Sequence, residues 1–198
     1  DLATLYSAND FHAESIGILR RMEHVDSNVT VDPAFNALRG ATLVLMNRLK
    51  EARKDFEVHA LANDADASLW RSLIAVKEQR WEDALQSFKE GADRLAAYRA
   101  DLHARFRLGA VRAALESDLL TEAASHLNAL PQAELPVALK ANFDVLRGRY
   151  LDSVGRDEEA ADAYEMASTS RHEPAVAEAR FFSTVLDHRV RRIDRDEA

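Results

Sequence analysis

One short pattern recurs five times along the chain and restricts the folds open to it. Each copy has a turn, then charged or polar residues, then an alanine, and four copies add a large apolar residue four positions later. The five alanines are 39, 32, 39 and 37 residues apart, which is close to the period of a helix–turn–helix repeat. They are Ala13, Ala52, Ala84, Ala123 and Ala160, and the large residues are Phe56, Phe88, Leu127 and Tyr164, whereas Gly17 follows the first alanine.

A second small residue lies upstream of the alanine. Gly40, Ser72 and Gly148 each lie 12 positions before it, and Gly109 is the counterpart in the fourth copy, displaced by two residues. Small side chains at both places let two paired helices approach closely. In the first copy, the position 12 residues before Ala13 is Asp1. We therefore expect the first helix to be cut short and the chain to be a fragment of a longer protein.

These small residues, at this period, resemble a tetratricopeptide-repeat array, and the resemblance covers essentially the whole chain. It implies an all-α fold, namely a right-handed superhelical solenoid of antiparallel helix pairs with about five repeats plus a terminal helix. The array would form a single domain over residues 1–198. The chain departs from the family, because Arg replaces Leu before the small residue in three units and most of the family's prolines are missing. It is therefore similar to divergent tetratricopeptide-like bacterial proteins of unassigned function.

Composition and helix signals agree with an all-helical chain. The 198 residues include 6 Gly and 4 Pro, fewer than all-β folds usually need for their turns. Pro33, Pro136 and Pro174 mark helix starts, and apolar residues follow them at spacings of three and four. We expect about eleven helices.

Charge and cysteine content exclude several function classes. The formal net charge of −8 disfavours a surface that neutralises nucleic-acid phosphates. The chain has no Cys, which excludes disulfides and thiolate chemistry. No apolar run is long enough to span a bilayer, so we expect no membrane insertion. The sequence leaves the compartment open between cytoplasm and periplasm.

Motifs for catalysis and metal binding are missing from the sequence. No two of the 7 histidines lie three or four positions apart, so none forms a helical pair of metal ligands. Neither a phosphate-binding Gly-rich loop nor a Gly-x-Ser-x-Gly elbow occurs. We therefore expect no enzymatic activity, no catalytic residue, no metal site and no cofactor.

The family resemblance points to a binding surface. In a tetratricopeptide superhelix the first helix of each pair lines the concave face, which suits a peptide or a partner's helix. The alternative is that the apolar members of this face pack between units. The candidate partner-binding residues are Lys77, His103, Phe106, Asn142, Arg149 and Asp152.

Arginines recur at equivalent or near-equivalent places. They are Arg39, Arg71, Arg107 and Arg147. A ladder of guanidinium groups could bind the carboxylates of a partner through forked hydrogen bonds. Alternatively, each stem covers apolar surface while its head pairs with an Asp or Glu of an adjacent unit.

Three functions remain open at this point. The first is a protein–protein interaction scaffold that binds a peptide or partner helix in its groove. The second is self-assembly, or a structural role, through the ends of the array. The third is an accessory domain of a larger sensor or enzyme.

Overall fold

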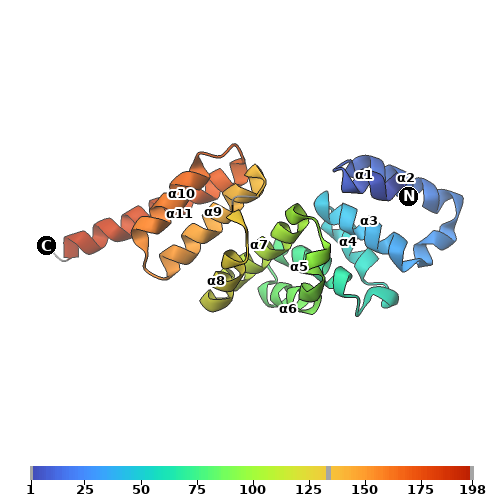
Figure 1. The fold of residues 1–198 in the computed structure, drawn as a ribbon, viewed down its shortest axis with the longest axis horizontal. Coiled ribbons are helices and arrows are strands. Elements are labelled where there is room, and N and C mark those ends of the chain that lie inside the picture. The colour runs from blue at the N-terminus through green and yellow to red at the C-terminus, as the bar shows by residue number, and fades with distance from the viewer. Residues whose placement is uncertain (1, 133–134, 197–198) are drawn as a thin grey trace. The chain divides into compact units, whose positions relative to one another are not determined.

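The described part of the chain is all-helical, as predicted. The computed structural model describes residues 2–132 and 135–196, and these residues form eleven α-helices, three short 3₁₀ helices and no strand (Figure 1). The chain divides into two compact units, Asp1–Leu95 and Ala96–Ala198. The single array over residues 1–198 stays a prediction.

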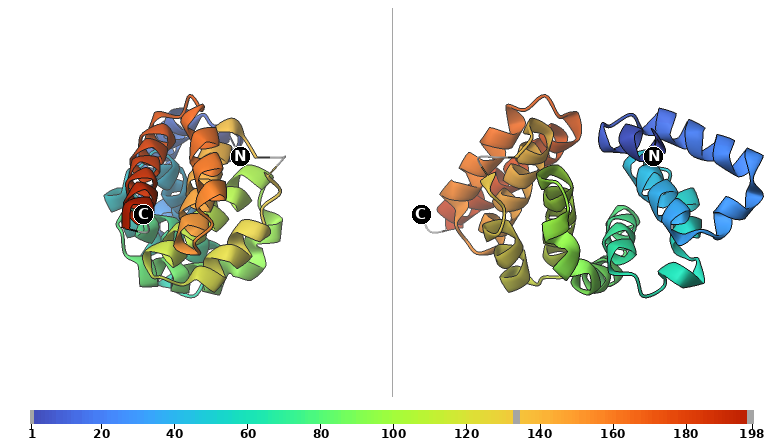
Figure 2. Two further views of the ribbon diagram at one scale, coloured as in Figure 1. Left: turned by 90° about the vertical axis from the view of Figure 1, so that its left-hand side faces the viewer. Right: turned by 45° about the vertical axis from the view of Figure 1, so that its right-hand side comes forward.

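Unit 1 contains three helix pairs. Consecutive helices pack as α1/α2, α3/α4 and α5/α6, and α3 also packs on the neighbouring first helix, α5 (Figure 2). Asp32 caps α3 by accepting a hydrogen bond from the backbone N–H of Ala34 at 2.9 Å. The helices are α1 (Leu2–Ala8), α2 (His12–Val25), η1 (Ser27–Val31), α3 (Pro33–Leu45), α4 (Leu49–Phe56), η2 (His59–Leu61), α5 (Ala65–Lys77), α6 (Trp81–Gly91) and η3 (Ala92–Ala97), the last of which runs into unit 2.

Unit 2 contains two helix pairs and a long final helix. The pairs are α7/α8 and α9/α10, α7 packs on α9, and α11 packs on both α9 and α10. Apolar residues of α11, including Ala175, Ala179 and Leu186, join a buried cluster around Tyr164. The helices are α7 (Ala100–Glu116), α8 (Leu120–Asn128), α9 (Val137–Ser153), α10 (Asp157–Ser168) and α11 (Glu173–Asp196).

The same turn joins the two helices of all five pairs. In each turn one residue has a left-handed backbone, with φ between 56° and 76°. The N–H of the next residue donates to the carbonyl five positions earlier, as from Arg48 to Leu43 at 2.8 Å. This is the Schellman arrangement, which satisfies carbonyls at the end of the first helix. The left-handed residues are Asp10, Asn47, Gln79, Asp118 and Gly155.

Small and large residues 16 positions apart hold the paired helices together. A Cβ added to Gly40 would lie 2.7 Å from the Phe56 ring, and one added to Gly148 would lie 2.5 Å from the Tyr164 ring. The repeated alanine of the second helix is fully buried in the last four pairs. The close approach predicted from these small residues is therefore present at both glycines.

The first copy of the repeat lies two residues later than predicted. Counted from the left-handed Asp10, the equivalent of the repeated alanine is Ser15, which is fully buried, whereas Ala13 is exposed. Ala3 then takes the upstream small position, and the Ser15 hydroxyl donates to its carbonyl at 2.9 Å. Leu19, buried, takes the large position. The count that led to Asp1 thus started from the wrong residue.

The fourth copy also differs from the prediction. Counted from the left-handed Asp118, the upstream position holds Val111 and not Gly109. Val111 and Leu127 are both buried. This copy thus has a larger residue on the first helix than Gly40 or Gly148, and a smaller one on the second than Phe56 or Tyr164.

Replacing Gly40 with alanine should destabilise unit 1 by about 1–3 kcal/mol, because the added methyl group overlaps the Phe56 ring. Denaturant unfolding followed by circular dichroism measures the change. Gly17 is the matched control, since nothing lies within 4 Å of an added Cβ there. Gly17→Ala should raise stability by up to about 1 kcal/mol, and adding Phe56→Leu to Gly40→Ala should recover part of the loss. An equal effect of both glycine substitutions would contradict the close contact.

Replacing Gln79 with glycine should raise stability by about 1 kcal/mol, because a side chain at positive φ is strained and glycine is not. Thermal unfolding measures the shift. Gln86 lies inside α6 and is exposed, so Gln86→Gly should lower stability by about 1 kcal/mol. Destabilisation by both substitutions would show that the Gln79 side chain makes a compensating interaction.

Candidate functional site

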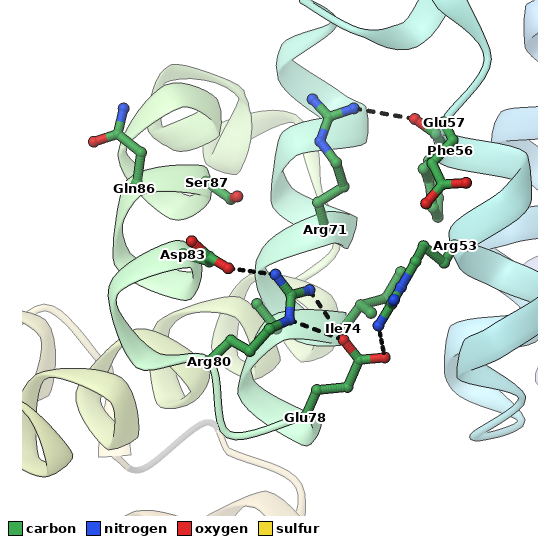
Figure 3. Close-up of a pocket in the computed structure, with 11 residues that line it drawn as sticks. Arg53, Phe56, Glu57, Arg71, Ile74, Glu78, Arg80, Asp83, Gln86 and Ser87 are labelled. Carbon is green, nitrogen blue, oxygen red and sulfur yellow. Dashed lines mark hydrogen bonds and ion pairs between the residues drawn. The ribbon is translucent and has the colours of Figure 1, made fainter.

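A pocket of about 650 Å³ opens in unit 1 between α4, α5 and α6 (Figure 3). Its apolar lining comes from Phe56, Ile74 and Ala75, all of which are buried. The remaining lining residues are charged or polar, and three are arginines, so we call it the arginine pocket. They are Arg53, Glu57, Arg71, Glu78, Arg80, Asp83, Gln86 and Ser87.

Two arginines from different helices converge on one carboxylate in this pocket. Arg53 of α4 and Arg80, which precedes α6, both form ion pairs with Glu78 at the end of α5, and the Arg80 pair measures 3.0 Å (Figure 3). The Glu78 side chain is 18% exposed and both arginines are nearly half exposed. Burial opposes ionisation of Glu78, but the hydrogen bonds from Arg53 and Arg80 outweigh it and lower the pKa of its carboxyl. Glu78 is therefore ionised at neutral pH.

The third arginine of the pocket, Arg71, is held by neutral acceptors. Its guanidinium donates to the carbonyls of Leu61 and Ala62 at 2.9 and 3.1 Å and to the Ser68 hydroxyl at 2.7 Å. Burial lowers the pKa of Arg71, yet a guanidinium stays charged at any ordinary pH. Arg71 thus fixes the loop after α4, and no described carboxylate contacts it directly.

An ion-pair network joins three helices of unit 2. Arg112 of α7 forms two hydrogen bonds of 2.7 Å with Glu178 of α11. Arg149 of α9 lies 2.7 Å from Glu116 and 3.7 Å from Glu178, and its guanidinium lies over the Phe182 ring at 4.7 Å. The four charged side chains are 15–31% exposed. They are therefore partly shielded from water but still reachable from outside.

A second group of charges lies at the other end of α11. Arg189 forms ion pairs of 2.5 Å with Asp152 of α9 and with Asp157 of α10. The hydroxyl of Tyr164 is buried without a hydrogen-bond partner among the described residues. Burial and the Asp152 charge both raise the pKa of Tyr164, so its hydroxyl stays neutral.

The predicted binding residues have different environments. Arg149 and Asp152 both belong to the charged groups of unit 2. Lys77 is exposed, and its Nζ donates to the side-chain carbonyl of Asn47 at 3.0 Å. Asn142 is half-buried on α9. The ring of His103 accepts a hydrogen bond of 2.8 Å from Arg107, and burial and the Arg107 charge lower the pKa of His103.

Phe106 is not a surface residue, and this prediction was wrong. Its side chain is fully buried, with its ring 5.1 Å from that of Tyr98. The residues three positions before Ser72 and Gly148, Leu69 and Val145, are also fully buried, so this position does not face a partner. In the corrected register Arg112 lies 11 residues before Ala123, as Arg149 lies 11 before Ala160. That spacing was the signal that could have identified Arg112.

The repeated arginines do not form one ladder. Arg39 forms a two-pronged ion pair with the buried Asp55 at 2.6–3.1 Å. It also pairs with Glu23 of the preceding helix pair at 3.0 Å and lies over the Phe35 ring. Arg39 therefore packs and pairs between adjacent helix pairs, as the structural interpretation predicted.

The other three arginines differ from Arg39 and from one another. Arg71 binds backbone carbonyls, and Arg107 donates to His103. Arg107 is also out of register, since Ala110 precedes the small-residue position in its helix. Arg147 is half-buried and forms no ion pair with a described residue. The three arginines that share a repeat position, Arg39, Arg71 and Arg147, thus have different contacts.

Comparisons with protein-family models, with curated proteins and with solved structures returned no match to this chain. Among the described residues, no three or more His, Asp or Glu side chains lie close enough together to bind a metal ion. None of the helices they form combines the length and the apolar character needed to cross a bilayer.

Replacing Arg39 with glutamine should destabilise unit 1 by about 3 kcal/mol, because Asp55 would remain buried without its counter-charge. Urea unfolding measures the loss. Arg48→Gln is the matched control, since Arg48 pairs with the exposed Glu51 and its removal should leave stability nearly unchanged. A small effect at Arg39 would mean that water enters and solvates Asp55.

Proposed function

We propose that the chain is a non-catalytic, tetratricopeptide-like interaction scaffold, a right-handed solenoid that binds a peptide or a partner's helix. The observation that supports this proposal is the recurrence of one hairpin, with the same turn and the same small–large contact. A single hairpin of this kind cannot bury its apolar faces alone, so neighbours stack and leave an extended surface free for a partner.

The surface proposed for binding is formed by the first helices of the pairs. Arg112 and Arg149 occupy equivalent positions on α7 and α9, and both contact Glu178 of α11. Repetition at one position places their side chains on the same face of successive helices. Partly exposed charges beside the Phe182 ring offer both polar and apolar contacts to a bound segment.

The charges indicate the kind of segment that would bind. A partner carboxylate could replace Glu116 at Arg149, because the guanidinium donates only one hydrogen bond to Glu116 and can donate to a new oxyanion in its place. An apolar side chain of the partner would then lie against Phe182. Lys77 is an exposed cation on the first helix α5 of unit 1. We therefore expect a peptide that combines acidic residues with an apolar anchor.

Charge reversal tests the surface. The protein is screened against a peptide array, and the tightest binders are measured by fluorescence anisotropy. Lys77→Glu should weaken binding of a peptide to unit 1, and Arg149→Glu binding to unit 2, each at least tenfold, or about 1.4 kcal/mol. Lys89→Glu is the matched control, because Lys89 is exposed on the second helix α6 and should leave binding unchanged.

Circular dichroism must first show that Arg149→Glu folds, because Arg149 also pairs within unit 2. If both reversals leave every detected interaction intact, this surface is not the binding site. Light scattering on the same samples tests self-assembly, the alternative favoured by exposed apolar residues on α1 and α11. A concentration-dependent increase in mass would support that alternative. The exposed apolar residues are Leu2 and Leu5 of α1 and Phe181 and Val185 of α11.

A further inference from the structure

Two residues of the arginine pocket do not follow the repeat. The residue after the repeated alanine is Arg53 in the second copy, whereas the equivalent positions hold Ile16, Leu85, Ala124 and Ala161. The residue before the left-handed turn residue is Glu78 in the third copy, and the equivalent positions hold Asn9, Met46, Ser117 and Val154. A side chain needed to build the hairpin would recur, so Arg53 and Glu78 serve something local to this place.

Arg80 has one contact that recurs and one that does not. Its ion pair with Asp83, three residues later, has counterparts at the start of α4 and α10. That contact belongs to the hairpin. Its bond to Glu78 has no equivalent, because Met46 and Val154 stand at that position in the other two hairpins. The pairs equivalent to Arg80–Asp83 are Arg48–Glu51 and Arg156–Glu159.

The position of the Glu78 carboxylate is a preformed oxyanion site. Guanidinium groups from two different helix pairs converge there, and each can donate two parallel hydrogen bonds. The adjoining pocket has the volume typical of small-ligand sites, and its lining combines charged and polar residues with three apolar ones. Glu78 lies just after the last turn of α5, so its side chain can swing toward solvent without disturbing a helix.

We propose that the arginine pocket binds a ligand carrying a carboxylate, whose oxygens replace those of Glu78 between Arg53 and Arg80. The apolar part of the ligand lies against Phe56, Ile74 and Ala75. The ligand is either a free organic acid or an acidic side chain of a peptide. This site lies wholly in unit 1. It shares no residue with the proposed peptide-binding surface on the first helices, which includes Lys77, Arg112 and Arg149.

Charge balance explains why Glu78 must leave. The lining holds three arginines and three carboxylates, so its formal charge is zero with Glu78 in place. A ligand carboxylate that entered beside Glu78 would add an uncompensated negative charge. When the ligand displaces Glu78, the same two guanidinium groups remain paired. Glu78 is thus an internal competitor of the ligand.

Isothermal titration calorimetry of the full chain tests the pocket, with glutarate and an acetylated, amidated Leu-Glu-Leu peptide as probes. Arg53→Gln and Arg80→Gln should each weaken binding about tenfold or more. Glu78→Gln should tighten binding about tenfold, because both arginines lose their internal partner. Arg94→Gln is the matched control, since Arg94 is an exposed arginine of unit 1 that pairs with Asp66 outside the pocket.

The sign of the Glu78→Gln effect distinguishes a binding site from a structural ion pair. Tighter binding supports the pocket, whereas unchanged or weaker binding overturns it. Failure of both probes to bind below about 10 mM also overturns it. A higher affinity for the tripeptide identifies a peptide side chain as the ligand, and a higher affinity for glutarate identifies a free acid. Thermal unfolding of each variant confirms that the unit is still folded.

Discussion

The contact between a small residue on one helix and a large residue on its partner governs this structure. An aromatic ring occupies the space where Gly40 and Gly148 have no side chain, and the repeated alanines beside it are fully buried. The helices can approach this closely only because these side chains are small. Where the first helix carries Val111, the residue 16 positions later is Leu127 in place of an aromatic residue, and both are buried.

Much of the fold could be predicted from the sequence, and the errors have a common cause. Scarce Gly and Pro, with Pro33 near a helix start, predicted an all-helical chain with about eleven helices. The first copy was misplaced because alanine is abundant and Ala13 resembled the repeated one. In the fourth copy Ala123 was placed correctly, but Gly109 was taken for the upstream small residue because that position holds Val111. The left-handed turn residue sets the position reliably. It is hard to recognise in sequence, because only one of the five is a glycine.

The candidate sites were predicted less well. Phe106 was selected at a position that is also buried in the third and fifth pairs, at Leu69 and Val145, and taking Gly109 as the small residue missed Arg112. The arginine pocket could not be predicted from the repeat at all, because Arg53 and Glu78 come from different helix pairs and meet only after folding. Residues that follow the repeat build the hairpins, and residues that depart from it create local chemistry.

The local character of the hairpin contacts affects how the chain folds. The two residues of each small–large contact are only 16 positions apart, so closing the connection costs little chain entropy. Folds dominated by such short-range contacts form quickly, and repeat proteins can begin folding at any unit. During synthesis, each hairpin could therefore close soon after its second helix has left the ribosome, before the next hairpin is complete.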